Sequence, residues 1–332
     1  MADMTLPPRL VGWPLASSPF HAGEMAMQAK AGLRERIERQ GRRIIRRAMP
    51  DQYRELFAKL PYLFLGSLDH QGRPWAAMLW GEPGFAASPD PRHLVIRTAP
   101  VPAAPFGAAL AAGTPVGLLG IELETRRRNR MNGRIVAVGD GAFTVRVDQS
   151  FGNCPQYIQA RDIMAVLPCE EPPAARPEGP ALSPAATAII TGADTFFIAT
   201  ASARPGDDDA AEGLDVSHRG GRPGFVRIDA VGGGSVLTIP DFRGNNAFNT
   251  FGNLAVRPRA GLLFPDFSSG DLLALTGTAE VLWDDPEIAA YAGARRLLRV
   301  RVEEGVQLPG AMPFRWMAPE PARELDATGA WA

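Results

Sequence analysis

Pro115-Val116-Gly117-Leu118-Leu119 and Arg259-Ala260-Gly261-Leu262-Leu263 are two copies of one short apolar pattern. In each copy a second glycine, Gly133 or Gly277, comes 16 residues after the glycine of the quoted stretch. Alternating apolar residues follow both of these later glycines, as is typical of strands. The two stretches therefore indicate that one arrangement of strands occurs twice along the chain.

A second match supports this division. Gly-Arg-Pro occurs at 72–74 and again at 221–223. Together the matches relate two halves of the chain by an offset of about 144–149 residues. We interpret them as an internal duplication, with chance similarity between two β-domains as the alternative.

The order of the predicted elements is similar in the two halves. Short apolar or alternating runs predict strands, and one short helix interrupts them in each half. The strands are predicted at 62–68, 74–80, 93–97, 116–121, 133–138 and 143–147, and then at 195–200, 225–228, 235–239, 260–264, 272–282 and 297–302. Helices are predicted at 23–48, 103–112 and 246–256.

Strands joined by hairpin-type turns and broken by one helix favour a small Greek-key barrel over a doubly wound sheet. The predicted fold class is mainly β: a β-barrel protein with a few helices, built as two tandem halves plus an N-terminal helix. Six prolines between 168 and 184 predict a semi-rigid linker between the halves. The predicted segments are an arm and helix at 1–49, a first half at 50–167, a linker at 168–185, a second half at 186–318 and a tail at 319–332.

Composition excludes several classes of protein. The net charge of −1 gives no global attraction to nucleic acid or to anionic membranes. No apolar run is long enough to span a bilayer, and no secretion signal is visible at the N-terminus. Cys154 and Cys169 suggest neither a disulfide framework nor a zinc site. We therefore expect a cytoplasmic protein without a metal centre. The arginine-rich helix at 30–47 is interpreted as a solvated face, with binding of an acidic partner or of a nucleotide phosphate as the alternative.

The stretch Asp-Phe-Arg-Gly-Asn-Asn at 241–246 follows a predicted strand and precedes a predicted helix. A helix N-terminus offers free N–H groups to an anion, and an arginine beside it can bind two phosphate oxygens. Asn245 is a suitable N-cap, and Asn249 could add a neutral donor. The residues predict a phosphate site anchored by Arg243, whereas an ordinary capped turn is the alternative.

Ser217, His218 and Arg219 precede the glycine-rich turn at 220–224. This cluster suits the rim of a site, and His218 is the best candidate for a general acid or base. A structural histidine beside a hairpin turn is the competing interpretation.

These motifs resemble the pyridoxamine 5'-phosphate oxidase-like family of FMN-binding split barrels. The resemblance depends on Asp-Val-Ser-His-Arg-Gly-Gly-Arg-Pro-Gly-Phe-Val-Arg at 215–227, Ile-Pro-Asp-Phe-Arg-Gly-Asn at 239–245 and the stretch 256–264. Ser-Phe-Gly-Asn-Cys-Pro-Gln-Tyr-Ile at 150–158 and His-Ala-Gly-Glu at 21–24 resemble a bacterial branch that carries two barrel halves in one chain. The resemblance runs from about 20 to 318.

The resemblance implies that the second half binds FMN and that the chain is an oxidoreductase, with NAD(P)H as a candidate electron donor. The true oxidase has a Ser-Arg-Lys type run where this chain has Asn-Asn-Ala, so pyridoxamine phosphate is not the expected substrate. The implied cofactor contacts are Ser217, Arg219, Phe225, Val226, Asp241, Arg243, Asn245 and Asn249, and the implied catalytic residue is His218.

We expect one flavin for each chain. The stretch 98–105 of the first half has three prolines, which lack N–H donors, where the second half has its phosphate motif. The first half is therefore predicted to serve as a wall of the site, through Asn153, Gln156 and Tyr157.

Other functions remain open at this point. A non-catalytic flavin reservoir or a haem-binding protein would have the same fold, and haem would require His21 or His218 as an axial ligand. A deazaflavin could replace FMN, and an interaction module with a degenerate site is a further alternative. The expected partner is a small-molecule substrate, with no nucleic acid, no membrane and a homodimer as one candidate assembly.

Overall fold

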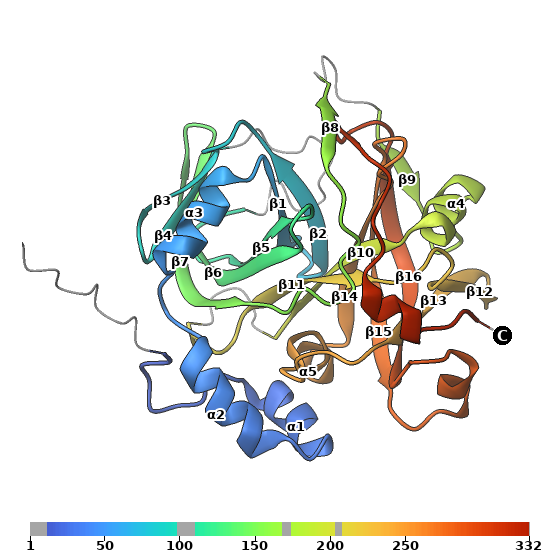
Figure 1. The fold of residues 1–332 in the computed structure, drawn as a ribbon, viewed down its shortest axis with the longest axis horizontal. Coiled ribbons are helices and arrows are strands. Elements are labelled where there is room, and N and C mark those ends of the chain that lie inside the picture. Colours follow the sequence, from blue (N-terminus) through green and yellow to red (C-terminus); the bar gives the residue numbers. More distant parts are fainter. Residues whose placement is uncertain (1–11, 98–109, 168–173, 203–207, 332) are drawn as a thin grey trace, which may run out of the picture.

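The computed structural model describes residues 12–97, 110–167, 174–202 and 208–331, and it contains two large antiparallel sheets (Figure 1). The strands of the first sheet are β1 (Tyr62–Leu68), β2 (Pro74–Trp80), β3 (Ala86–Asp90), β4 (His93–Arg97), β5 (Pro115–Glu122), β6 (Arg127–Gly139) and β7 (Ala142–Gly152). Those of the second are β10 (Thr195–Ala201), β11 (Leu214–Gly220), β12 (Arg227–Val231), β13 (Gly234–Asp241), β14 (Arg259–Pro265), β15 (Leu272–Leu282) and β16 (Arg296–Leu308).

The two sheets have the same strand order. The first runs β2-β1-β5-β6-β7-β4-β3 and the second runs β11-β10-β14-β15-β16-β13-β12, which is the same sequence of positions in each half. A short strand, β9 (Arg176–Glu178), adds to β16. The mainly β fold in two tandem halves is therefore confirmed.

The repeated apolar strands occupy equivalent places. Leu118 of β5 lies opposite Leu65 of β1, and Leu262 of β14 lies opposite Ile198 of β10. Each half also has a β-bulge at the later glycine, between 132 and 133 in β6 and between 276 and 277 in β15. An added Cβ at either glycine would lie 2.0 Å from a carbonyl oxygen of the next strand. The glycines are thus required by equivalent bulges.

The Gly-Arg-Pro match is wrong. The glycine at 72 lies in the turn between β1 and β2, whereas 221–223 follow β11. The true counterpart of Gly-Arg-Pro-Gly-Phe at 221–225 is Gly-Glu-Pro-Gly-Phe at 81–85, which follows β2. In both, the phenylalanine N–H donates to the carbonyl three residues earlier, and the second glycine has a positive φ of 95° or 86°.

The glycines of the repeated strands allow the halves to pack closely. An added Cβ at Gly117 of β5 would lie 2.6 Å from the carbonyl oxygen of Leu214 in β11. The equivalent atom at Gly261 of β14 would lie 2.4 Å from the carbonyl oxygen of Pro74 in β2. β5 of the first half therefore packs against β11 of the second, and β14 of the second packs against β2 of the first. Such reciprocal contacts are those of a two-fold symmetric dimer.

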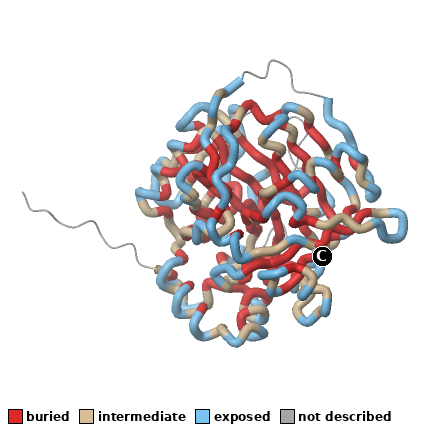
Figure 2. Tube along the Cα trace, turned by 45° about the vertical axis from the view of Figure 1, so that its right-hand side comes forward, coloured by how far each residue is buried: buried red, intermediate tan, exposed pale blue. Residues whose placement is uncertain are grey.

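Buried residues occur in both halves (Figure 2), and the core of the first half extends across this contact. Phe64 of β1 and Phe197 of β10 stack with ring centroids 3.4 Å apart. The core of the first half also includes Leu214 and Leu263 from the second half. Burial of apolar surface from both halves, at about 25 cal/mol for each Å², stabilises their association.

Five α-helices lie around the sheets in the described part of the chain. The predicted single helix at 23–48 is wrong, since it divides where Gly32 adopts a φ of 70°. The helices at 51–59 and 184–192 were not predicted, and the predicted helix at 103–112 falls mostly outside the described residues. The five are α1 (Ala22–Lys30), α2 (Arg34–Ile44), α3 (Asp51–Lys59), α4 (Pro184–Gly192) and α5 (Asn249–Val256).

Helices α1 and α5 cross at two glycines. An added Cβ at Gly23 would lie 2.1 Å from the carbonyl oxygen of Gly252, and one at Gly252 would lie 2.6 Å from the Cα of Glu24. α1 starts with a capping box, in which His21 accepts from Gly23 N–H and Glu24 accepts from His21 N–H. The His-Ala-Gly-Glu motif therefore fixes α1 against α5.

Two further strands form a separate ribbon. β8 (Ile163–Val166) pairs with β17 (Phe314–Trp316) near the top of Figure 1. β9 lies within the segment predicted as a linker, so part of that segment belongs to the second sheet. Residues 225–226, predicted to open a strand, precede β12, whereas β11 was not predicted as a strand.

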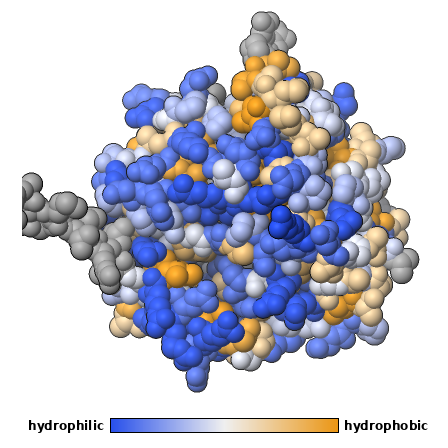
Figure 3. Space-filling view, in the orientation of Figure 1, coloured by the Kyte–Doolittle hydropathy of each residue, from blue (hydrophilic) through white to orange (hydrophobic). Residues whose placement is uncertain are grey.

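The surface is mostly hydrophilic in the view of Figure 3, with an apolar patch over β8. Met164 and Val166 of that strand are 67% and 61% exposed. Elsewhere on the surface, α2 exposes Arg36, Arg39 and Arg43 to solvent. Over the residues described, no helix combines the length and apolar character needed to cross a membrane.

Candidate functional site

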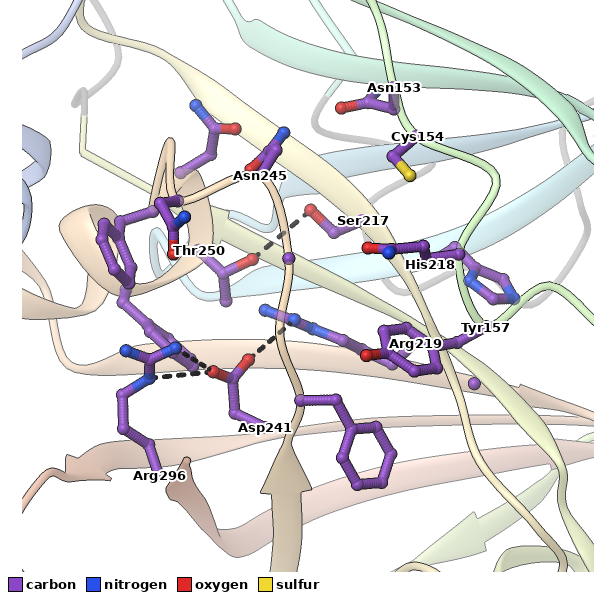
Figure 4. Close-up of a pocket in the computed structure, with 18 of the residues that line it drawn as sticks. Asn153, Cys154, Tyr157, Ser217, His218, Arg219, Asp241, Asn245, Thr250 and Arg296 are labelled. Carbon is purple, nitrogen blue, oxygen red and sulfur yellow. Dashed lines mark hydrogen bonds and ion pairs between the residues drawn. The ribbon is translucent and has the colours of Figure 1, made fainter. Parts of the chain in front are cut away.

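A polar pocket lies between the two halves, where β11 and β13 approach α5 and the segment after β7 (Figure 4). Its enclosed volume is about 130 Å³, and it is open to solvent. The second half contributes Ser217, His218, Arg219, Gly220, Phe225, Pro240, Asp241, Phe242, Gly244, Asn245, Asn246, Phe248, Asn249, Thr250, Phe251 and Arg296. The first half contributes Arg128, Arg130, Asn153, Cys154, Gln156 and Tyr157.

Two arginines converge on one carboxylate at the end of β13. Arg219 Nη1 lies 3.1 Å from Asp241 Oδ1, and Arg296 Nη2 lies 2.8 Å from Asp241 Oδ2. Aromatic rings hold both guanidinium groups, since Phe251 lies 5.4 Å from that of Arg219 and Phe248 lies 5.0 Å from that of Arg296. Burial, with Arg130 and Arg296 nearby, lowers the pKa of Arg219 despite the Asp241 carboxylate.

A buried network behind the pocket joins the two halves. Arg130 of β6 donates to Asp215 of β11 at 2.9 Å, to Asn249 of α5 at 3.0 Å and to the Ser217 hydroxyl at 2.5 Å. Asn249 in turn donates to Glu24 of α1 at 2.5 Å. Strand β6, strand β11 and both helices therefore determine where the lining side chains lie.

Arg128 has no carboxylate partner among the residues that the structure describes. Its Nε donates to the Cys154 carbonyl at 2.8 Å. Burial, followed by the charges of Arg130 and Arg219, lowers the pKa of Arg128 to about 9. In the described residues a carbonyl, and no carboxylate, accepts from Arg128, so its positive charge is available to an anionic ligand.

The pocket carries an excess of positive charge. Four arginines line it with one acid, Asp241, and Asp215 lies behind it, so four positive and two negative charges leave a balance of +2. Several buried donors at its wall have no hydrogen-bond partner among the described residues: Arg130 Nε, Arg219 Nε and Asn153 Nδ2. Buried polar groups are rarely left unsatisfied, so these donors are available to water or to a ligand rich in acceptors.

His218 is buried on β11 and packs its ring edge-on against Phe197, with centroids 5.6 Å apart. Burial, then the charges of Arg128 and Arg219, lowers the pKa of His218 well below its ordinary value. Its Nε2 has no partner within the described part of the chain. At neutral pH the imidazole is therefore uncharged.

Most of the sequence-predicted residues meet at this pocket. Seven line it: Ser217, His218, Arg219, Phe225, Asp241, Asn245 and Asn249. As expected, Asn153, Gln156 and Tyr157 of the first half form part of the wall. Val226 belongs to the core of the second half instead, because it follows the turn and points into the sheet packing.

Arg243 is exposed, and its side chain is not among the groups that line the pocket. Its carbonyl accepts from the Tyr157 hydroxyl at 3.0 Å. The helix also starts later than predicted, because α5 is capped by Phe248 in the left-handed region and not by Asn245. The Asn245 side chain instead accepts from Ala247 N–H, forming a local turn.

Sequence reasoning missed Arg128, Arg130 and Arg296. Arg128 and Arg130 are two residues apart on β6, so their side chains share one face of that strand. This alternation was a usable signal, but the predicted strand began at 133 and excluded both residues. Arg296 carries no motif, since only the pairing of β16 with β13 places it opposite Asp241.

The duplication allows a direct comparison with the equivalent position in the first half. Aligning the turn at 221–225 with the turn at 81–85 gives an offset of 140 residues. The residues equivalent to Ser217, His218 and Arg219 are therefore Ala77, Met78 and Leu79. Aligning the bulge glycines Gly133 and Gly277 gives an offset of 144 residues. The residues equivalent to Arg128 and Arg130 are therefore Leu272 and Ala274. All five apolar counterparts are buried in the core. At the position equivalent to the polar pocket, the described residues therefore form buried apolar core.

The fold and this pocket define a tandem split-barrel protein with an arginine-lined pocket between its halves. Residues 49–168 match the model of the family described as Pyridoxamine 5'-phosphate oxidase. The match covers 120 of the 332 residues, and it makes this part of the chain similar to that family. The match covers the half that supplies Arg128 and Arg130, although the sequence motifs had pointed to the other half.

Three solved structures resemble parts of the chain. A FAD-binding protein from Mesorhizobium loti is 14% identical, with 41% of this chain and 97% of that chain covered and a TM-score of 0.26. The heme storage protein HutZ from Vibrio cholerae is 16% identical over 39% of this chain and 96% of its own, with a TM-score of 0.25. HupZ of Group A Streptococcus is 10% identical over 31% of this chain and 94% of its own, with a TM-score of 0.25.

At such low identities and TM-scores, none of the three similarities bears on the ligand or activity of this chain. A comparison with curated proteins found no match. No group of three or more potential metal-binding side chains occurs in the segments that the structure describes.

Proposed function

We propose that the chain binds one FMN in the pocket between its halves and acts as a flavin-dependent oxidoreductase on a small-molecule substrate. The observation that carries this proposal is the uncompensated charge of +2 at a pocket whose wall includes unpartnered buried donors. A phosphate monoester supplies up to two negative charges and three acceptor oxygens, which suits that balance.

The residues present fit such a ligand. Arg128, Arg130 and Arg219 would hold the phosphate, since all three carry guanidinium groups at the wall and two have unpartnered Nε atoms. Tyr157 and Phe242, whose rings are 5.2 Å apart, offer an aromatic surface for a flavin ring. Ligand pockets commonly enclose about 300–1,000 Å³, so a flavin would extend from the enclosed 130 Å³ into the open mouth.

When bound, FMN would supply hydride and electron transfer, and NAD(P)H is a candidate donor. The chain would bind, orient and shield it. His218 would serve as a neutral hydrogen-bonding group, because its low pKa makes it a weak base at neutral pH.

The absorption spectrum of the purified protein tests the proposal, together with titrations of FMN and riboflavin followed by flavin fluorescence. Each charge-assisted hydrogen bond contributes about 1.5–3 kcal/mol, so we expect FMN to bind at least tenfold more tightly than riboflavin. Equal affinities would refute a phosphate site. Consumption of NAD(P)H with an added electron acceptor would then separate an enzyme from a flavin reservoir.

A haem-binding function is the second candidate, and one observation favours it. His218 Nε2 lines the same pocket without a partner in the described residues and could coordinate iron. His21 is a poorer candidate, because its Nδ1 accepts from Gly23 N–H and its ring lies outside this pocket. A Soret band in the purified protein, lost in His218→Ala, would favour haem over FMN.

A further inference from the structure

A second pocket lies outside the proposed flavin site. It is bounded by the end of α4, the turn after β11, the turn between β14 and β15, and the segment after β17. Its volume is about 420 Å³, which falls within the range typical of small-molecule sites. The family match and the proposed FMN site leave this pocket unexplained.

Three polar side chains at this pocket have unsatisfied atoms. Arg161 Nη2 forms a 2.6 Å ion pair with Asp194 Oδ2, and the Arg161 side chain is only 3% exposed. Arg161 Nε and Nη1, Asp194 Oδ1 and Trp316 Nε1 are all buried without a hydrogen-bond partner in the part of the chain that is described. Buried polar groups are rarely left unsatisfied, so four such atoms in one place require an explanation.

The rest of the wall is mostly apolar and partly aromatic, and Asp266 and Ser268 are its other polar residues. The Arg161 guanidinium lies 3.9 Å from the centroid of the Phe267 ring. Phe267 also meets Trp316 edge-on, with centroids 5.3 Å apart and planes at 84°. Ile189 of α4 and Pro223 complete this side. Such walls suit a flat organic ring better than a cluster of water molecules.

We propose that this pocket binds a small aromatic carboxamide. The amide oxygen accepts hydrogen bonds from Arg161 and Trp316, and the amide N–H group donates to Asp194. Because Arg161 and Asp194 neutralise each other and Asp266 adds a negative charge to the lining, a neutral head group fits the site better than a carboxylate. The ring of the ligand lies against the apolar wall.

Binding of benzamide to the full-length protein tests the proposal, with benzoate as the charged analogue. Saturation-transfer NMR and isothermal titration would measure both. We expect saturable binding of benzamide and at least tenfold weaker binding of benzoate. Absence of saturable benzamide binding, or equal binding of benzoate, would overturn the proposal and would indicate that water satisfies these groups.

Two variants locate the site. Ala188 is exposed and lines the pocket from α4, so Ala188→Trp should fill it and abolish benzamide binding. Thr191→Trp, on the same helix but outside the lining, is the matched control and should bind as the parent does. Trp316→Phe keeps a ring and removes Nε1–H, so benzamide affinity should fall roughly three- to tenfold.

FMN titrations of the same variants keep this proposal separate from the first one. Ala188→Trp should leave FMN affinity unchanged, because Ala188 does not line the pocket between the halves. Benzamide binding that survives Ala188→Trp would show that it occurs elsewhere and would overturn the assignment.

Discussion

At the scale of single residues, the charges that matter come from strands. Arg128 has no carboxylate partner in the described residues, whereas Arg243 is exposed and does not line the pocket. Arg219 and Arg296 are partly neutralised by Asp241. The contribution of an arginine to anion binding therefore depends on its partners as much as on its position in a motif.

Arg128→Gln should lower FMN affinity about ten- to a hundredfold, because it removes a charge-assisted contact worth about 1.5–3 kcal/mol. Arg243→Ala should have the smaller effect. Fluorescence titration measures both, and Arg127→Gln is the control, since Arg127 donates to the Gln52 carbonyl away from the pocket. A larger loss of FMN affinity in Arg243→Ala would mean that Arg243, in the loop before α5, binds the phosphate.

His218 should make stability depend on pH. Its pKa is lowered in the folded state, so the unfolded chain takes up a proton first as the pH falls below about 6.5. The folding free energy from this group is therefore present above that pH and declines below it, by up to about 1.4 kcal/mol for each pH unit.

Urea unfolding of ligand-free protein between about pH 7.5 and 5.5 measures this decline. His218→Gln should have a shallower slope than the parent protein, whereas His70→Gln, at an exposed position, should not. Parallel slopes for the parent and His218→Gln would mean that the pKa of His218 is the same in the folded and unfolded protein, which would contradict its lowered pKa.

At the scale of elements, α5 depends on α1. Asn249 and Thr250 line the pocket from the first turn of α5, and Glu24 of α1 accepts from Asn249. Burial and the nearby Asp215 carboxylate raise the pKa of Glu24 well above its usual range. The crossing at Gly23 and Gly252 leaves no space for a side chain. Changes far from the ligand at this crossing should therefore reach the pocket.

Gly252→Ala should destabilise the protein by about 1–3 kcal/mol, because the new Cβ would lie 2.6 Å from Glu24 Cα and the helices must separate. FMN affinity should fall with it. The matched control is Gly192→Ala in α4, where no atom lies within 4 Å, and stability there should be equal or higher by about 0.4–1 kcal/mol. Thermal unfolding and FMN titration report both effects, and equal behaviour of the two variants would exclude a tight crossing.

At the scale of the whole molecule, duplication created two equivalent positions and the side chains distinguish them. Polar groups occupy one, while Met78, Leu79 and Leu272 fill the other with buried apolar surface. A phosphate at the second position would lose its hydration without gaining donors. The tandem arrangement therefore permits asymmetry that an identical pair of chains could not have.

Titration should thus saturate at one FMN per chain. The expected measurement is a single class of site by fluorescence quenching, with the protein concentration fixed by amino-acid analysis. Arg128→Gln and Arg219→Gln should weaken the same binding event, because the two arginines belong to different halves of one pocket. Two equivalent flavins per chain would contradict the prediction that the position filled by apolar side chains binds no flavin.

The sequence by itself determined the mainly β class, the duplication and most of one wall of the site. These features are local: the strand pattern depends on side-chain alternation, and Gly133 and Gly277 mark bulges that a single strand pair requires. The cluster at 217–219 was visible because its residues are adjacent in the chain.

Only the tertiary structure decided which residues from distant segments share the pocket. Arg130 and Ser217 are 87 residues apart and meet because Gly117 and Gly261 let the two halves approach closely. It also showed that the true repeat of the 221–225 turn is at 81–85, since strand pairing, and not the identity of three letters, defines equivalence. The pocket's positive charge comes from arginines of both halves, and no single stretch of sequence shows that these arginines lie together.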